Sequence, residues 1–112
     1  MKDYASMSDA EINASVAKIM FEVNEGIATP YSHRPDAYIY HLNGLHSVKD
    51  YCNNPADAWP IITENGISII HLDDNEWGCR GEGDKSACRA INSNALRCAM
   101  IVFLMMKESE ND

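Results

Sequence analysis

The sequence predicts one small α+β domain spanning residues 1–112, in which a small, mostly antiparallel sheet packs against an amphipathic N-terminal helix and a buried C-terminal helix. Three observations predict it. The length of 112 residues and the 46% hydrophobic content suit one packed core. Apolar residues recur at helical spacing near the N-terminus, and an unbroken apolar run lies near the C-terminus. Between them, an Asn-Gly pair separates two runs of strand-forming residues.

The first helix is predicted over about Asp9 to Asn24. Ser8 and Glu11 have the spacing of a capping box, in which each side chain binds the other residue's backbone amide. Gly26 follows as a stop signal. Between these ends an apolar stripe repeats every three or four residues, at Ile12, Val16, Ile19, Met20 and Val23.

A hairpin is predicted in the middle of the chain. Residues 27–36 contain two prolines and are typical of a loop. Tyr38 to Leu42 is rich in strand-forming residues, and Asn43-Gly44 favours a tight turn because both central positions need positive φ. Leu45 to Val48 is then the expected return strand.

A second, short helix is predicted after this hairpin. Asn54 can cap it and Pro55 suits its first position, where the missing amide hydrogen costs nothing. Asp57 in the first turn complements the helix dipole. Pro60 requires the helix to be short, kinked or split, and Asn65-Gly66 ends it.

Two further strands are predicted, Ile67 to Leu72 and Glu76 to Arg80, joined by a turn over residues 73–75. The segment from Gly81 to Asn92 is polar and contains two glycines. We expect it to be a mobile loop.

The last helix is predicted from about residues 92–94 to Lys107, with the acidic tail from Glu108 to Asp112 frayed. Its residues from Cys98 to Met106 are apolar on all sides, so several faces must be covered. Either this helix lies between the sheet and the first helix, or part of it is buried in a second copy, which makes a homodimer one hypothesis.

Charge and composition narrow the function classes. The formal net charge is −8 and the nine basic residues are scattered, which disfavours direct binding to nucleic acid or to anionic lipid. Residues 1–8 show no apolar signal region, and no run approaches the roughly 20 residues of a membrane helix. We therefore expect a cytoplasmic protein whose four cysteines are reduced thiols.

Four blocks of the chain carry a resemblance to a known family. They are Met7 to Asn13, Asp50 to Ile62 with its Asn53-Asn54-Pro55-Ala56-Asp57-Ala58-Trp59-Pro60 core, Glu64 to Ile69, and Leu96 to Met106. Their order and spacing resemble the NinX proteins of tailed phages and prophages of enteric bacteria. The resemblance implies a phage accessory protein of unknown function that works in the bacterial cytoplasm and is dispensable to virion assembly.

This chain departs from the family pattern in two places. Ala95 stands where members often have proline, so the last helix can begin earlier. Residues 78–92, including Cys79 and Cys88, look specific to this chain, which puts a shared role for those two thiols in doubt. The family has no assigned catalytic residues, so none is carried over.

The second helix and its entry contain the main candidate for an interaction patch. Most of its residues also have a structural interpretation: caps for the two asparagines, a first-turn anion for the aspartate, and a core position for the tryptophan with Ile61 and Ile62. The alternative is a recognition surface, because a tryptophan beside a tyrosine and polar neighbours suits a binding hot spot. The candidate patch is Tyr51, Asn53, Asn54, Asp57 and Trp59.

A catalytic alternative rests on histidines. His41 and His46 can face each other across the predicted hairpin, with His33 near in sequence, and could form the acid–base pair of a small hydrolase or nuclease. No nucleophile elbow, P-loop or dinucleotide fingerprint accompanies them. The leading hypothesis is therefore noncatalytic binding of a host or phage protein, for which the acidity favours a basic partner surface.

No metal or cofactor is predicted. Cysteine knuckles that pre-orient zinc ligands are absent from the sequence, because the closest cysteines, Cys79 and Cys88, are nine positions apart. His71 and Cys52 would have to complete such a site. A calcium loop starting at Asp73 would place Trp77 where an oxygen ligand is needed, so a solvated hairpin turn is the better interpretation.

Overall fold

The computed structural model describes residues 3–20, 28–30, 38–42 and 45–110. It confirms the α+β class, with three α-helices and antiparallel strands. In chain order the elements are a 3₁₀ helix Tyr4–Ser6, α1 Asp9–Met20, β1 Ala28–Pro30, β2 Tyr38–Leu42, β3 Leu45–Lys49, α2 Pro55–Glu64, β4 Ser68–Asp73, β5 Glu76–Arg80, a 3₁₀ helix Gly83–Lys85, β6 Arg89–Asn92 and α3 Ala95–Glu110.

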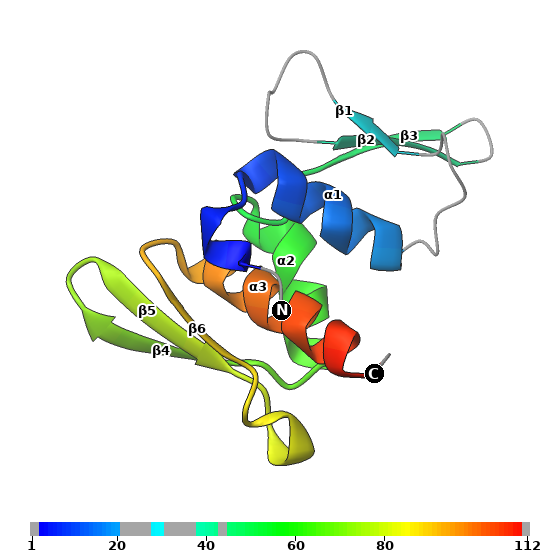
Figure 1. Cartoon of the computed structure of the whole chain (residues 1–112). Helices are drawn as coiled ribbons and strands as arrows, with labels where there is room; N and C mark the ends of the chain where they lie inside the picture. The colour runs from blue at the N-terminus through cyan, green and yellow to red at the C-terminus, as the bar shows by residue number, and fades with distance from the viewer. Residues whose placement is uncertain (1–2, 21–27, 31–37, 43–44, 111–112) are drawn as a thin grey trace.

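The strands form two three-stranded sheets instead of the one small sheet expected. Their orders are β1-β2-β3 and β4-β5-β6, and every pairing is antiparallel. The helices lie between the two sheets (Figure 1): α1 contacts β1 and β2, whereas α3 contacts β5 and β6. The apolar C-terminal helix therefore has neighbours on several sides, since α1 and α2 also pack on it.

The two strands that the sequence did not predict are the short outer strands of the sheets. Residues 28–30 were expected in a loop but form β1, in which Pro30 pairs with Tyr38. Residues 89–92 were expected in a mobile loop but form β6, which pairs with β5. A short edge strand is hard to predict from its own sequence, because it is held by hydrogen bonds to a partner strand elsewhere in the chain. An edge strand can also contain proline, which usually indicates a loop.

The start of α1 confirms the predicted capping box. The Ser8 amide donates to Glu11 Oε1 at 3.1 Å, and the Glu11 amide donates to Ser8 Oγ at 3.1 Å. The buried residues Ile12, Val16 and Ala17 form the stripe that faces the core. The predicted continuation to Asn24 lies outside the described residues.

The predicted hairpin is confirmed by the pairing of β2 with β3, in which Leu42 lies opposite Leu45. Its expected turn, residues 43–44, lies outside the described part of the chain. In α2, Asn54 caps the helix by accepting a hydrogen bond from the Ala56 amide at 3.0 Å. The helix continues through Pro60 to Glu64 and is capped by Asn65, and Gly66 adopts a φ of 61°, which favours glycine.

Of the two alternatives for the apolar C-terminal helix, the structure shows the first: α3 contacts α1 and α2 as well as β5 and β6. Asn94 caps it by accepting hydrogen bonds from the amides of Leu96 at 2.9 Å and Arg97 at 3.1 Å. The helix continues to Glu110. The expectation of a frayed tail was therefore wrong for residues 108–110. Its buried side chains are Cys98, Ala99, Met100, Ile101, Val102, Phe103, Leu104 and Met106.

None of the helices in the described residues is long and apolar enough to cross a membrane.

Candidate interaction surfaces

The structure divides the predicted patch into anchoring residues and one exposed aromatic side chain. Tyr51 is 3% exposed and belongs to the hydrophobic core, so it cannot contact a partner. Asn54 is occupied as the cap of α2. Asn54 therefore has the capping role that the sequence allowed, whereas Tyr51 lies in the core, a position that the sequence analysis did not assign to it.

Asp57 holds the first turn of α2 against the end of β3. Its Oδ2 accepts a hydrogen bond from the Asp50 amide at 2.9 Å, and its Oδ1 lies 3.5 Å from Lys49 Nζ. Asn53 is exposed, but its side chain is also engaged: its amide donates to Asp9 and Asp50. These hydrogen bonds tie the start of α2 to the end of β3 and to α1.

Trp59 differs from the structural interpretation. The sequence placed it in the core with Ile61 and Ile62, yet its side chain is 58% exposed while the two isoleucines are buried. Helical periodicity explains the difference: positions 58, 61 and 62 share the face that meets the core. The opposite face carries the exposed residues Ala56, Trp59, Pro60 and Thr63, here called the Trp59 face.

A buried polar network behind this face was not predicted. The Asn13 side chain donates to Asp50 Oδ1 at 2.9 Å and accepts from the Cys52 amide at 3.0 Å. Asn94 donates to the Cys52 carbonyl at 2.8 Å. One sequence signal existed, since Asn13 follows Ile12 inside the apolar stripe of α1. The network joins α1, the α2 entry and the α3 cap.

Arg97 is a second anchor that sequence reasoning missed. Its Nη1 lies 2.7 Å from Asp9 Oδ1, and the pair is mostly buried. Its Nη2 donates to the backbone carbonyls of the segment before α1, including Ala5 at 3.3 Å and Met7. A guanidinium suits this role because its donors form a planar fork that can bind several acceptors.

For two of the three histidines of the catalytic alternative, His41 and His46, the structure describes the backbone. His41 and His46 are register partners across β2 and β3, as the hairpin predicted. Their side chains and all of His33 lie outside what the structure describes, so the hydrolase alternative stays a prediction. His71, in β4, packs against Trp77 of β5 with 4.6 Å between the ring centroids.

The cysteines are free thiols, with Cys52, Cys79 and Cys98 buried. A hydrogen bond with Cys98, together with burial, raises the pKa of the Cys79 thiol, so this thiol stays protonated at neutral pH. Among the described residues, no group of three or more His, Cys, Asp or Glu side chains is arranged to hold a metal ion. Asp73, where a calcium loop would have begun, ends strand β4 in a hairpin with β5, as the sequence favoured.

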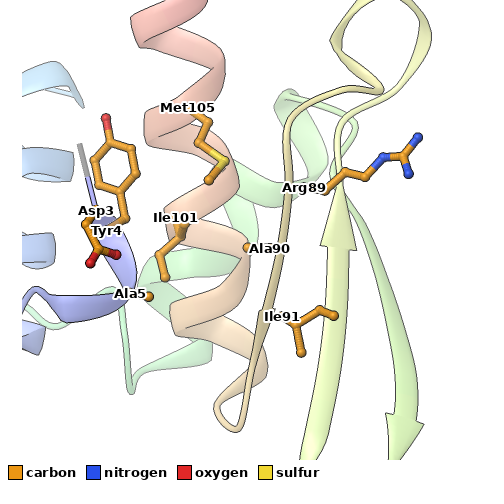
Figure 2. A pocket seen from close by; sticks show the side chains of 8 residues that line it. All are labelled: Asp3, Tyr4, Ala5, Arg89, Ala90, Ile91, Ile101 and Met105. Atoms are coloured by element: carbon orange, nitrogen blue, oxygen red, sulfur yellow. The ribbon is translucent and has the colours of Figure 1, made fainter. Parts of the chain in front are cut away.

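An open cavity of about 430 Å³ lies between the N-terminal segment, β6 and α3 (Figure 2). Ile101 and Met105 of α3 form an apolar wall opposite Ala90. Its charged lining residues are Asp3 and Arg89, both exposed, and the described residues that line it include no histidine, cysteine or serine.

The geometry defines a class of protein: a small acidic α+β domain with a rigid helical core, exposed apolar side chains and a polar network that serves structure. A family model described as "Bacteriophage P22, NinX" matches residues 3–107. The chain therefore belongs to this phage family, as its sequence blocks indicated. The comparisons with curated proteins and with solved structures found no match.

Proposed function

We propose that the chain is a noncatalytic phage accessory protein that acts in the bacterial cytoplasm by binding another protein through the Trp59 face. The observation that carries the proposal is the 58% exposure of Trp59. Tryptophan is enriched among residues that dominate binding energy, because a large ring buries much area for little lost side-chain entropy. An exposed tryptophan gains apolar burial when a partner's apolar pocket covers it.

The support beneath Trp59 favours a binding role. Ala58, Ile61 and Ile62 anchor the opposite side of α2 in the core. The Asn54 cap and the hydrogen bond from the Asp50 amide to Asp57 hold the first turn. A surface on a pre-ordered helix pays little conformational entropy on binding, which increases affinity.

The partner's chemistry follows from the surroundings of this face. Its own members are apolar or hydroxylic, Glu64 is exposed at the end of the same helix, and the chain has a net charge of −8. A complementary partner has an apolar pocket for the indole ring with basic residues around it. Proteins whose basic surface also binds nucleic acid are one class of partner with this chemistry.

The test is an affinity capture from lysate of an infected host, with wild-type and Trp59→Ala proteins immobilised side by side. We expect proteins that the wild type retains and the variant loses. Met20→Ser, which removes an exposed apolar side chain from the end of α1, is the matched control and keeps them. We expect both variants to fold, because the side chain that each loses is exposed. Circular dichroism checks that they do.

A direct measurement follows with any captured partner. In a Trp77→Phe background, Trp59 is the remaining tryptophan of the chain. Its fluorescence emission shifts to shorter wavelength when the partner covers it. The proposal fails if Trp59→Ala captures the same proteins as the wild type, or if the emission of Trp59 is unchanged in the complex.

A further inference from the structure

The outer face of the β4-β5-β6 sheet is apolar and exposed. The side chains of Ile70, Leu72 and Ile91 are 48%, 52% and 62% exposed. They lie on the side away from α3, because the intervening Cys79 is buried towards the helix. Gly78 lies among them: a Cβ atom there would be 3.1 Å from Leu72 Cδ1.

The strand register arranges this face in three rows. The middle row is apolar, since Ile70 pairs with Gly78 and Gly78 pairs with Ile91. A shallow depression of about 200 Å³ is lined by Ile70, Gly78 and Ile91 of this row together with Arg80 and Arg89 of the next. The row therefore offers an apolar strip that runs across all three strands, with the Leu72 side chain over Gly78.

The rows on either side have opposite charge. At one end Arg80 of β5 pairs with Arg89 of β6, and both are exposed. At the other end Glu76 pairs with Asp73, and Asp74 follows in the turn, all three exposed. Along β5, Arg80 and Glu76 lie two residues on either side of Gly78, about 7 Å in each direction.

We propose that this face binds the same face of a second copy of the chain. The two-fold axis lies between the two sheets and runs across the strands at the level of Gly78. Strand direction is then reversed between the copies, so Arg80 of each lies over Glu76 of the other, and Ile70 and Ile91 meet their own counterparts. Face-to-face sheets pack about 10 Å apart, which side chains of this size fill.

The charge pattern favours a second copy as the occupant. An isologous interface must be complementary to itself, which requires basic and acidic groups at equal distances from the axis. The spacing of Arg80 and Glu76 about Gly78 meets this condition. The contact area of one three-stranded face is small, so a weak dimer in rapid exchange with monomers is expected.

Sedimentation in reducing buffer, from about 5 μM to about 1 mM chain, tests the proposal over the range of weak interfaces. We expect the wild-type mass to rise towards that of a dimer. Arg80→Glu places two like-charge contacts in the dimer, and Glu76→Arg does the same with the opposite sign, so each variant alone stays monomeric. Ile70→Lys, which brings two lysines together, also stays monomeric.

Mixing distinguishes this arrangement from others. Arg80→Glu and Glu76→Arg proteins have opposite charges at both contacts, so an equimolar mixture forms a mixed dimer, and the double variant dimerises by itself. Lys18→Glu and Glu64→Arg reverse exposed charges elsewhere and leave the wild-type behaviour unchanged.

Three outcomes overturn the proposal. A wild-type chain that is monomeric at about 1 mM leaves a different protein as the partner of this face. A dimer that all three single variants preserve uses another surface. Two monomeric charge variants that do not associate when mixed exclude the reversed two-fold arrangement.

Discussion

The side-chain amide of Asn13 donates a hydrogen bond to the carboxylate of Asp50 at 2.9 Å, and both residues are buried. They come from α1 and from the end of β3, 37 residues apart in the chain. Since the Asn13 carbonyl also accepts from the Cys52 amide, one side chain holds the α2 entry against α1. The Trp59 face is positioned by this contact.

Asn13→Ala is expected to lower the free energy of unfolding by about 2–3 kcal/mol, because it removes two buried hydrogen bonds. Urea denaturation followed by circular dichroism measures the loss. Lys18→Ala, at an exposed position of the same helix, is the control and changes stability by less than about 0.5 kcal/mol. Equal values for the two variants would contradict the structural importance of the network.

Asn94→Ala is expected to destabilise the protein by about 2 kcal/mol, because Asn94 caps α3 and also donates to the Cys52 carbonyl at 2.8 Å. Asn94→Asp keeps the capping oxygen and loses the donor, so its cost is smaller. Thermal or urea unfolding of both variants gives the comparison. If the aspartate variant is as unstable as the alanine variant, capping is not the main role.

Arg97→Lys keeps the positive charge beside Asp9 but cannot bind the carbonyls of Ala5 and Met7 together. We expect a loss of about 1–3 kcal/mol and faster hydrogen exchange in residues 4–9. Arg80→Lys, at an exposed position of β5, is the matched control and changes stability by less than about 0.5 kcal/mol. Unchanged exchange in the N-terminal segment would show that Arg97 does not anchor it.

The stability of the protein is expected to fall at high pH through Tyr4. Burial, with the hydrogen bond that Tyr4 donates to Glu108 at 2.6 Å, raises the pKa of its phenol to about 12. The unfolded chain ionises this group near pH 10. Above that pH the unfolded state loses a proton that the folded state keeps, so the free energy of unfolding decreases between pH 10 and about pH 12.

Tyr4→Phe isolates this contribution, because it removes the phenol and leaves the other titrating groups. Below pH 10 the variant is less stable than the wild type by about 1 kcal/mol, the value of one hydrogen bond. The difference shrinks as the pH rises from 10 towards about 12. Parallel stability curves for the two proteins would show that Tyr4 titrates normally in the fold.

Local sequence determined the helix starts, the central hairpin and the family. Ser8 with Glu11, and Asn54 with Pro55, act within one turn of chain, so their spacing predicts the caps that the structure has. The apolar run in α3 likewise required a helix that is covered on several faces, whatever covers it.

The tertiary structure alone decided which side chains are buried in α2 and how the strands are distributed. Trp59 and Ile62 are both apolar, and only the direction in which α2 packs on α3 leaves the first exposed and the second covered. The edge strands β1 and β6, and the Asn13–Asp50 contact, depend on partners distant in the chain. Burial and long-range hydrogen bonding are set by the whole packed core, which spacing along the sequence does not specify.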